Sequence, residues 1–176
     1  MKLIHSPVCD LCSLGQVGSF LHMFWECPAV SSFWKLVSST LSELLEVDIP
    51  CSPEILLLND TSLLNLSSTR THTLLAGLTA AKKMLALRWK PPHTLTRAQW
   101  LQTFLSILYM EMSVARMHGA SQKTIQTWAS VAAMVKDLLE WEMCICVLVL
   151  VYLLVFLFLF SLFFTYILAY RNLGAV

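Results

Sequence analysis

The chain has 176 residues, of which 57% are hydrophobic and 13% charged, and this excludes a uniformly soluble globule, in which about 45–50% are apolar and about 25% charged. The net charge of +1 hides an uneven distribution, because residues 70–123 contain eight basic residues and one acidic residue, whereas residues 1–69 contain two basic and seven acidic ones. Such a local basic excess can attract a polyanion, and the length suits one domain or a small domain with an appendage.

The N-terminal segment carries a cluster of potential metal ligands. Cys9 and Cys12 are separated by two residues, and His22 and Cys27 by four, in the spacing C-x2-C-x9-H-x4-C. A short helix over FLHMFWE, which the following proline stops or redirects, would carry the second pair towards the first. Three thiolates and one imidazole with no open position are typical of structural Zn²⁺. The alternatives are a chance cluster in which Cys27 packs as a small hydrophobic side chain, or His5 as a substitute ligand.

The stretch AVSSFWKLVSSTLSELLEV predicts an amphipathic helix, because its apolar residues recur at the helical period. They form one stripe: Val30, Phe33, Trp34, Val37, Leu41, Leu44 and Leu45. After it, DIPCSPE and NDTSLLNLSST are typical of linkers, on either side of a short apolar run from Ile55 to Leu58.

Three further helices are expected before the apolar C-terminus. The second should run from about Thr71 to Trp89 and end at KPPH, since proline cannot continue the helical hydrogen bonds. The third should begin at Thr96, which forms a capping box with Gln99, and stop at Gly119. The fourth begins two residues after that glycine. Its apolar face contains Trp128, Val131, Val135 and Leu138.

Residues 143–170 form a tail without a charge, a glycine or a proline. As a continuous helix the tail would be about 42 Å long, more than the roughly 30 Å of a bilayer core, so it predicts a transmembrane helix. The expected location is a membrane, with a single-pass C-terminal anchor and a cytosolic N-terminal part. If the tail is not inserted, the expected location is cytoplasmic or nuclear.

The predicted fold is therefore mainly α. It comprises a zinc-knuckle-like segment over residues 1–28, a helical domain of about four helices over residues 29–142 that includes the basic region 70–123, a hydrophobic transmembrane helix over residues 143–170, and a short tail over residues 171–176. The spacing of the six cysteines does not suggest a disulfide framework, so reduced thiols are expected.

The motifs CDLC and GSFLHMFWECP, followed by a helix with Phe33 and Trp34, resemble the cysteine-rich C-terminal segment of the reverse transcriptase protein of LINE-type non-LTR retrotransposons, especially those of fish genomes. Downstream, LLAGLTAAKKMLALRWKPPHTLTRAQWLQTF, YMEMSVARMHG and IQTW resemble the helices that end that protein. The resemblance covers roughly residues 8–130 and does not include the apolar tail. It implies that the metal-type cluster consists of Cys9, Cys12, His22 and Cys27. It places Lys82, Lys83, Trp89, Lys90 and Trp100 in the following helical element.

The sequence predicts no catalytic activity. The family's polymerase and endonuclease need paired acidic residues that bind divalent metal, and the aspartates of this chain form no such pair on a strand. A glycine-rich phosphate loop is also missing. The chain is therefore expected to be a non-catalytic fragment without a small-molecule substrate.

Binding of RNA or another single-stranded nucleic acid is the predicted function, because cations suit phosphates and indoles suit base stacking. The candidate contacts are Lys82, Lys83, Arg88, Trp89, Lys90 and Arg97. The alternative is a solvated basic helix face with Trp89 and Trp100 in the core. Two other functions stay open: a tail-anchored membrane protein with a cytosolic interaction domain, and a decayed fragment without a selected function.

Overall fold

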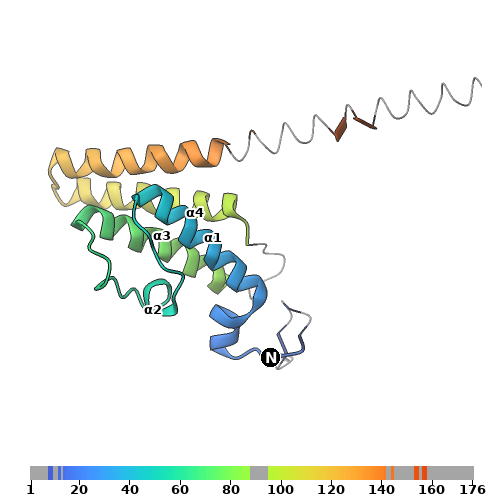
Figure 1. Ribbon diagram of the computed structural model, residues 1–176. Coiled ribbons are helices and arrows are strands. Elements are labelled where there is room, and N and C mark those ends of the chain that lie inside the picture. The colour runs from blue at the N-terminus through green and yellow to red at the C-terminus, as the bar shows by residue number, and fades with distance from the viewer. Residues whose placement is uncertain are drawn as a thin grey trace, which may run out of the picture. The chain divides into compact units, whose positions relative to one another are not determined.

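The computed structural model describes residues 8, 9, 12, 14–87, 95–141, 144, 153, 154, 156 and 157. The described residues are mainly helical, as predicted (Figure 1). They form the π-helix η1 (His22–Glu26), then α1 (Pro28–Leu45), α2 (Pro53–Leu56), α3 (Ser68–Leu87) and α4 (Arg97–Met117), and residues 122–141 are also helical. The chain divides into two compact units, Met1–Asp137 and Leu138–Val176, and the first contains all five labelled helices.

Helix α1 confirms the predicted amphipathic stripe. Six of its seven predicted members are buried, and the seventh, Leu44, is half-buried. Pro28 is the first residue of α1 because proline needs no N–H there, so it redirects the chain and starts a helix. The helix ends at Glu46, whose left-handed backbone (φ 52°) lets its N–H and that of Val47 bond to the last carbonyls.

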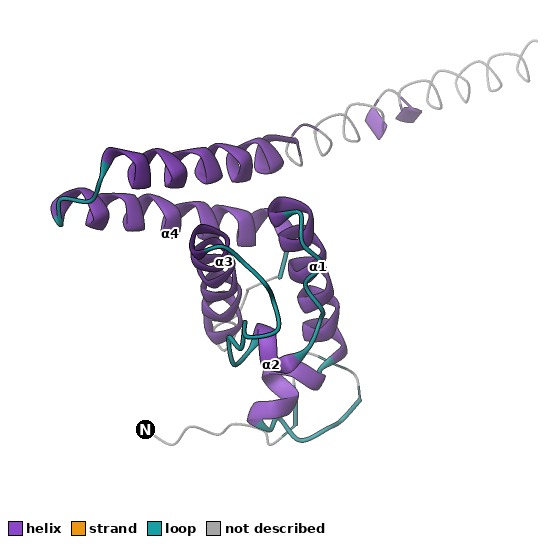
Figure 2. Cartoon of the chain, turned by 60° about the vertical axis from the view of Figure 1, so that its left-hand side comes forward, coloured by secondary structure: helices purple, strands orange, loops and turns teal. Residues whose placement is uncertain are grey.

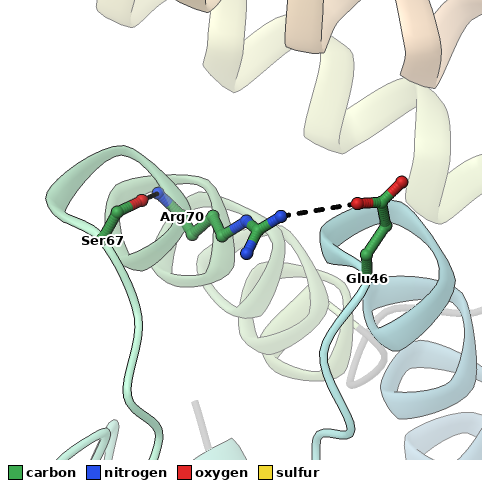
Figure 3. Close-up of polar contacts among 3 residues, drawn as sticks. All are labelled: Glu46, Ser67 and Arg70. Carbon is green, nitrogen blue, oxygen red and sulfur yellow. Dashed lines mark hydrogen bonds and ion pairs between the residues drawn. The ribbon is translucent and has the colours of Figure 1, made fainter.

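Helix α3 begins three residues earlier than predicted, because Ser67 caps it: the Arg70 N–H donates to the Ser67 hydroxyl at 3.4 Å. Arg70 also contacts the Glu46 carboxylate at 3.5 Å and so joins the start of α3 to the end of α1 (Figure 3). These side chains are 45% and 82% exposed, so the pair contributes little stability. The predicted end of α3 at Trp89 lies outside the described residues.

The predicted start of α4 is confirmed. The Gln99 N–H donates to the Thr96 hydroxyl at 3.2 Å, which satisfies one of the unpaired donors of the first turn. Gly119 follows the helix with φ +69°, a conformation that suits glycine. The next helix is capped by Ser121, which accepts the Thr124 N–H at 3.2 Å, and its residues 122–137 run alongside α4 (Figure 1).

The core lies where α1, α3 and α4 contact one another (Figure 2). Gly77 of α3 permits the closest approach, because a Cβ there would lie 2.8 Å from Leu41 Cδ2 and 3.4 Å from the Phe104 ring. The Trp100 indole N–H donates to the Gly77 carbonyl at 3.0 Å and is fully buried. One small residue therefore sets the packing of three helices.

The predicted membrane anchor is wrong. No helix in the part of the chain that the structure describes is both long and apolar enough to cross a bilayer. A spanning helix needs about 20 predominantly apolar residues, whereas the long helices α3 and α4, of 20 and 21 residues, include charged side chains. The described residues are therefore mainly α with no helix that could span a membrane, and they do not support the predicted C-terminal anchor. Of the predicted span 143–170, residues 144, 153, 154, 156 and 157 are described, and they are helical; the others lie outside the described residues.

Candidate metal centre

The four predicted ligands lie together at the N-terminal end of the fold. One ligand atom from each of Cys9, Cys12, His22 and Cys27 lies within 4.8 Å of the ligand atoms of the other three. Cys9, His22 and Cys27 are buried and Cys12 is half-buried, and the Cys12 sulfur lies 3.4 Å from His22 Nε2. None of the described cysteines forms a disulfide. Three sulfurs and one imidazole nitrogen can therefore converge on one metal ion.

A short loop positions the first pair of ligands. Val8 and Val17 form an antiparallel bridge, and the Cys9 N–H donates to the Gln16 carbonyl at 2.8 Å. Gly15 has φ +62°, a conformation that glycine adopts without strain. The chain therefore folds back on itself between Val8 and Val17, with Cys9 beside the bridge and Cys12 within the loop.

A π-turn positions the second pair. The Cys27 N–H donates to the His22 carbonyl at 2.9 Å, which is the five-residue hydrogen bond of a π-helix. In an α-helix, residues five apart point about 140° away from one another, whereas in a π-turn they lie one turn apart. The Ser19 hydroxyl also accepts the His22 N–H at 3.1 Å. The predicted short helix is present, but the π-turn is what brings His22 beside Cys27.

Helix α1 holds this turn in place. The Trp34 indole N–H donates to the Phe24 carbonyl at 2.8 Å, and the Trp34 ring lies 6.2 Å from that of Trp25. The Cys27 carbonyl accepts the N–H groups of Val30 and Ser31, each at 2.8 Å. The sequence placed Trp34 in the apolar stripe and missed this second role, which no spacing rule could have indicated.

The electrostatics of the cluster favour a bound cation. The Leu14 backbone N–H lowers the pKa of the Cys12 thiol, but desolvation and the nearby thiols of Cys9 and Cys27 together raise this pKa above its usual value. Neighbouring thiolates repel one another, and a divalent cation relieves that repulsion as the thiols lose their protons. His22 Nε2 faces the Cys12 sulfur, and His22 Nδ1 is buried without a hydrogen-bond partner. The residues present fit a four-coordinate metal ion.

The predicted nucleic-acid contacts are not equivalent. Lys82 is half-buried, and its ammonium group donates to the Leu57 carbonyl at 3.2 Å and to Asn59 Oδ1 at 2.6 Å. Desolvation lowers the pKa of this lysine. Lys83 is exposed, and Arg97 is half-buried. Lys82 thus has a structural role that its position in a basic run concealed.

The aromatic contacts can be placed only in part. Arg88, Trp89 and Lys90 lie outside the described residues. Trp100 is fully buried in the core, as the alternative of a packed tryptophan predicted. Of the predicted set, Lys83 is therefore the described residue that is exposed to a partner.

Comparison with known proteins supplies no family. No family model matches the chain, and no solved structure matches it. The resemblance to the LINE reverse transcriptase protein therefore stays a prediction.

Proposed function

We propose that Cys9, Cys12, His22 and Cys27 bind a structural Zn²⁺ ion. The observation that carries this proposal is the convergence of the four ligand atoms within 4.8 Å. Three sulfurs and one nitrogen make the ligand set of closed tetrahedral zinc sites, which leave no coordination position for a substrate. The role assigned to the metal is therefore structural and non-catalytic.

The metal would hold the N-terminal loop to the π-turn. The Val8–Val17 bridge and the hydrogen bond from the Cys9 N–H to the Gln16 carbonyl also fasten the loop. Apolar side chains of the loop are exposed to solvent: Val17 is 66% exposed and Leu14 57%. Burial of apolar surface therefore contributes little to the stability of the loop. A segment of this kind orders when metal binding supplies the missing free energy.

Cobalt substitution tests the geometry of the site. Full-length protein loaded with Co²⁺ should show the intense visible absorption of tetrahedral cobalt–thiolate coordination, and Cys12→Ser should weaken or abolish it. Cys51→Ser is the matched control, because Cys51 is an exposed cysteine outside the cluster. A spectrum typical of six-coordinate cobalt, or one that Cys12→Ser leaves unchanged, would contradict the proposal.

We further propose that the zinc-organised helical body binds single-stranded nucleic acid and derives from a LINE-type reverse transcriptase protein. The origin is proposed from the motif resemblance over residues 8–130. The support for nucleic-acid binding is the excess of eight basic residues over one acidic residue in residues 70–123, together with the exposed Lys83. No hydrogen bond or ion pair engages the Lys83 ammonium within the described part of the chain. Its charge is therefore available to a phosphate.

Two adjacent lysines provide the test. The affinity of the full chain for a single-stranded RNA should fall with salt, and each phosphate contact contributes about 0.7 to the slope of log K against log salt. Lys83→Gln should lower that slope by about 0.7. Lys82→Gln should leave the slope unchanged and lower the stability, because it removes the hydrogen bond to Asn59. Salt-independent binding, or no binding, would refute the nucleic-acid proposal.

A further inference from the structure

A groove with several polar side chains lies between three helical segments of the first unit. It has a volume of about 530 Å³, and its walls come from the first turn of α3, the C-terminal half of α4 and the first turns of the helix over residues 122–141. Sites for small molecules have volumes of about 300–1,000 Å³. A second hollow of about 320 Å³ adjoins it, and the two share His72, Glu111 and Trp128. The two hollows therefore adjoin at these residues, and together they are called the depression below.

An aromatic pair lies where the two hollows meet. The rings of His72 and Trp128 are 6.1 Å apart and meet edge-on at 70°. The imidazole can cover at most one face of the indole, and Trp128 lines both hollows. An indole face beside an open groove is a stacking surface for a nucleobase, because every base has a flat aromatic face.

The ends of the depression are basic. Lys123 and His118 line the larger hollow, and Lys83 lines the smaller one. Lys123 is exposed, and its ammonium group has no hydrogen bond or ion pair with any described residue. The larger hollow also contains the hydroxyl groups of Ser68 and Thr69, which can donate to phosphate oxygens, whereas the Thr127 hydroxyl already donates to the Lys123 carbonyl at 2.9 Å.

Glu111 is the single acidic residue of the depression. It lies beside the aromatic pair, where its carboxylate can accept hydrogen bonds from a base amino group or a ribose hydroxyl. The depression therefore has cations at its two ends and an acceptor at its centre. This distribution is complementary to a nucleotide, whose phosphate is anionic and whose base and sugar carry donors.

We propose that this groove binds a nucleotide of single-stranded RNA, with the base against Trp128 and the phosphate against Lys123. The strand continues towards Lys83, which lies fifteen residues after Ser68 on α3, or about 22 Å along the helix. The inference rests on the proposed nucleic-acid function and assigns it a site. That site lies away from the metal cluster and includes only one of the six contacts predicted from the sequence.

The Trp128 indole N–H signal in a ¹⁵N NMR spectrum of the full chain reports the base contact. The chain has six tryptophans, and the signal that Trp128→Phe removes identifies Trp128. Adenosine monophosphate should shift this signal strongly, adenosine weakly and inorganic phosphate least. A Trp128 signal that adenosine monophosphate leaves unmoved overturns the groove.

Two matched variants test the phosphate contact. Lys123→Gln should weaken adenosine monophosphate binding about tenfold, which is the effect of one charge-assisted hydrogen bond, and should leave adenosine binding unchanged. Lys35→Gln, at an exposed lysine of α1 outside the groove, is the control. Equal affinities for adenosine monophosphate in wild type and Lys123→Gln overturn the proposal.

The RNA titration separates the two proposals. The groove is supported if RNA shifts the Trp128 indole signal and if Lys123→Gln lowers the slope of log K against log salt by about 0.7. Strand binding that depends on Lys83 but leaves Trp128 unmoved overturns the groove alone. If the chain binds no RNA strand, both proposals fail: the nucleic-acid function and the assignment of the groove as its site.

Discussion

Replacing Gly77 with alanine should destabilise the protein, even though alanine favours a helix interior over glycine by about 1 kcal/mol. The new Cβ would lie 2.8 Å from Leu41 Cδ2 and 3.4 Å from two atoms of the Phe104 ring. Leu41 and Phe104 are both fully buried, so neither can turn into solvent. Overpacking of this kind costs about 1–3 kcal/mol, which leaves a net loss of about 1 kcal/mol in the free energy of unfolding.

Urea denaturation of the zinc-saturated full chain, followed by circular dichroism, measures this loss. Leu41→Val provides the decisive second background, because valine lacks the Cδ2 atom that the new methyl group meets. There the Gly77→Ala change should cost nothing or become stabilising, a coupling typical of residues in contact. If Gly77→Ala stabilises the wild-type background, the close crossing of α1, α3 and α4 is wrong.

Three smaller effects follow from the same structure. Thr96→Ala removes the cap of α4 and should cost about 1 kcal/mol in urea denaturation; an unchanged midpoint would contradict the cap. Ser38→Ala should lower the free energy of unfolding by about 1–3 kcal/mol, because the buried Ser38 hydroxyl donates to the Ile49 carbonyl. A loss below about 0.5 kcal/mol, which is typical of an exposed site, would contradict this buried hydrogen bond. Glu46→Gln should change the free energy of unfolding by less than about 1 kcal/mol, since the ion pair of Glu46 with Arg70 is exposed. A larger loss at low salt would contradict the small contribution assigned to this ion pair.

Local sequence patterns predicted the elements whose position depends on one local feature, such as a single buried face or a capping side chain. The stripe of α1 was predictable because that helix is buried on one side, and the start of α4 because a threonine cap is a local feature. Helix α3 has buried residues on several sides, including Thr73, Leu78 and Ala81, because it packs against both α1 and α4. Its sequence therefore has no single stripe, and its first turn was placed too late.

Features that depend on tertiary contacts were not predictable. The ligand spacing indicated the metal cluster, but neither the π-turn between His22 and Cys27 nor the hydrogen bond from Trp34 to Phe24 has a spacing signal. Lys82 belongs to a basic run, yet its partner Asn59 is 23 residues away in the sequence. The membrane prediction came from the length of the uncharged run over residues 143–170, of which the structure describes only residues 144, 153, 154, 156 and 157.

The metal content of the purified full chain tests the central claim most directly. Elemental analysis should find about one zinc ion per chain in the wild type and in Cys51→Ser, because Cys51 lies outside the cluster. Cys12→Ser should lose most of the zinc, since three ligands with a weak fourth hold the ion poorly. Wild-type protein that binds no zinc when refolded in its presence, or Cys12→Ser protein that retains a full equivalent, would contradict the account.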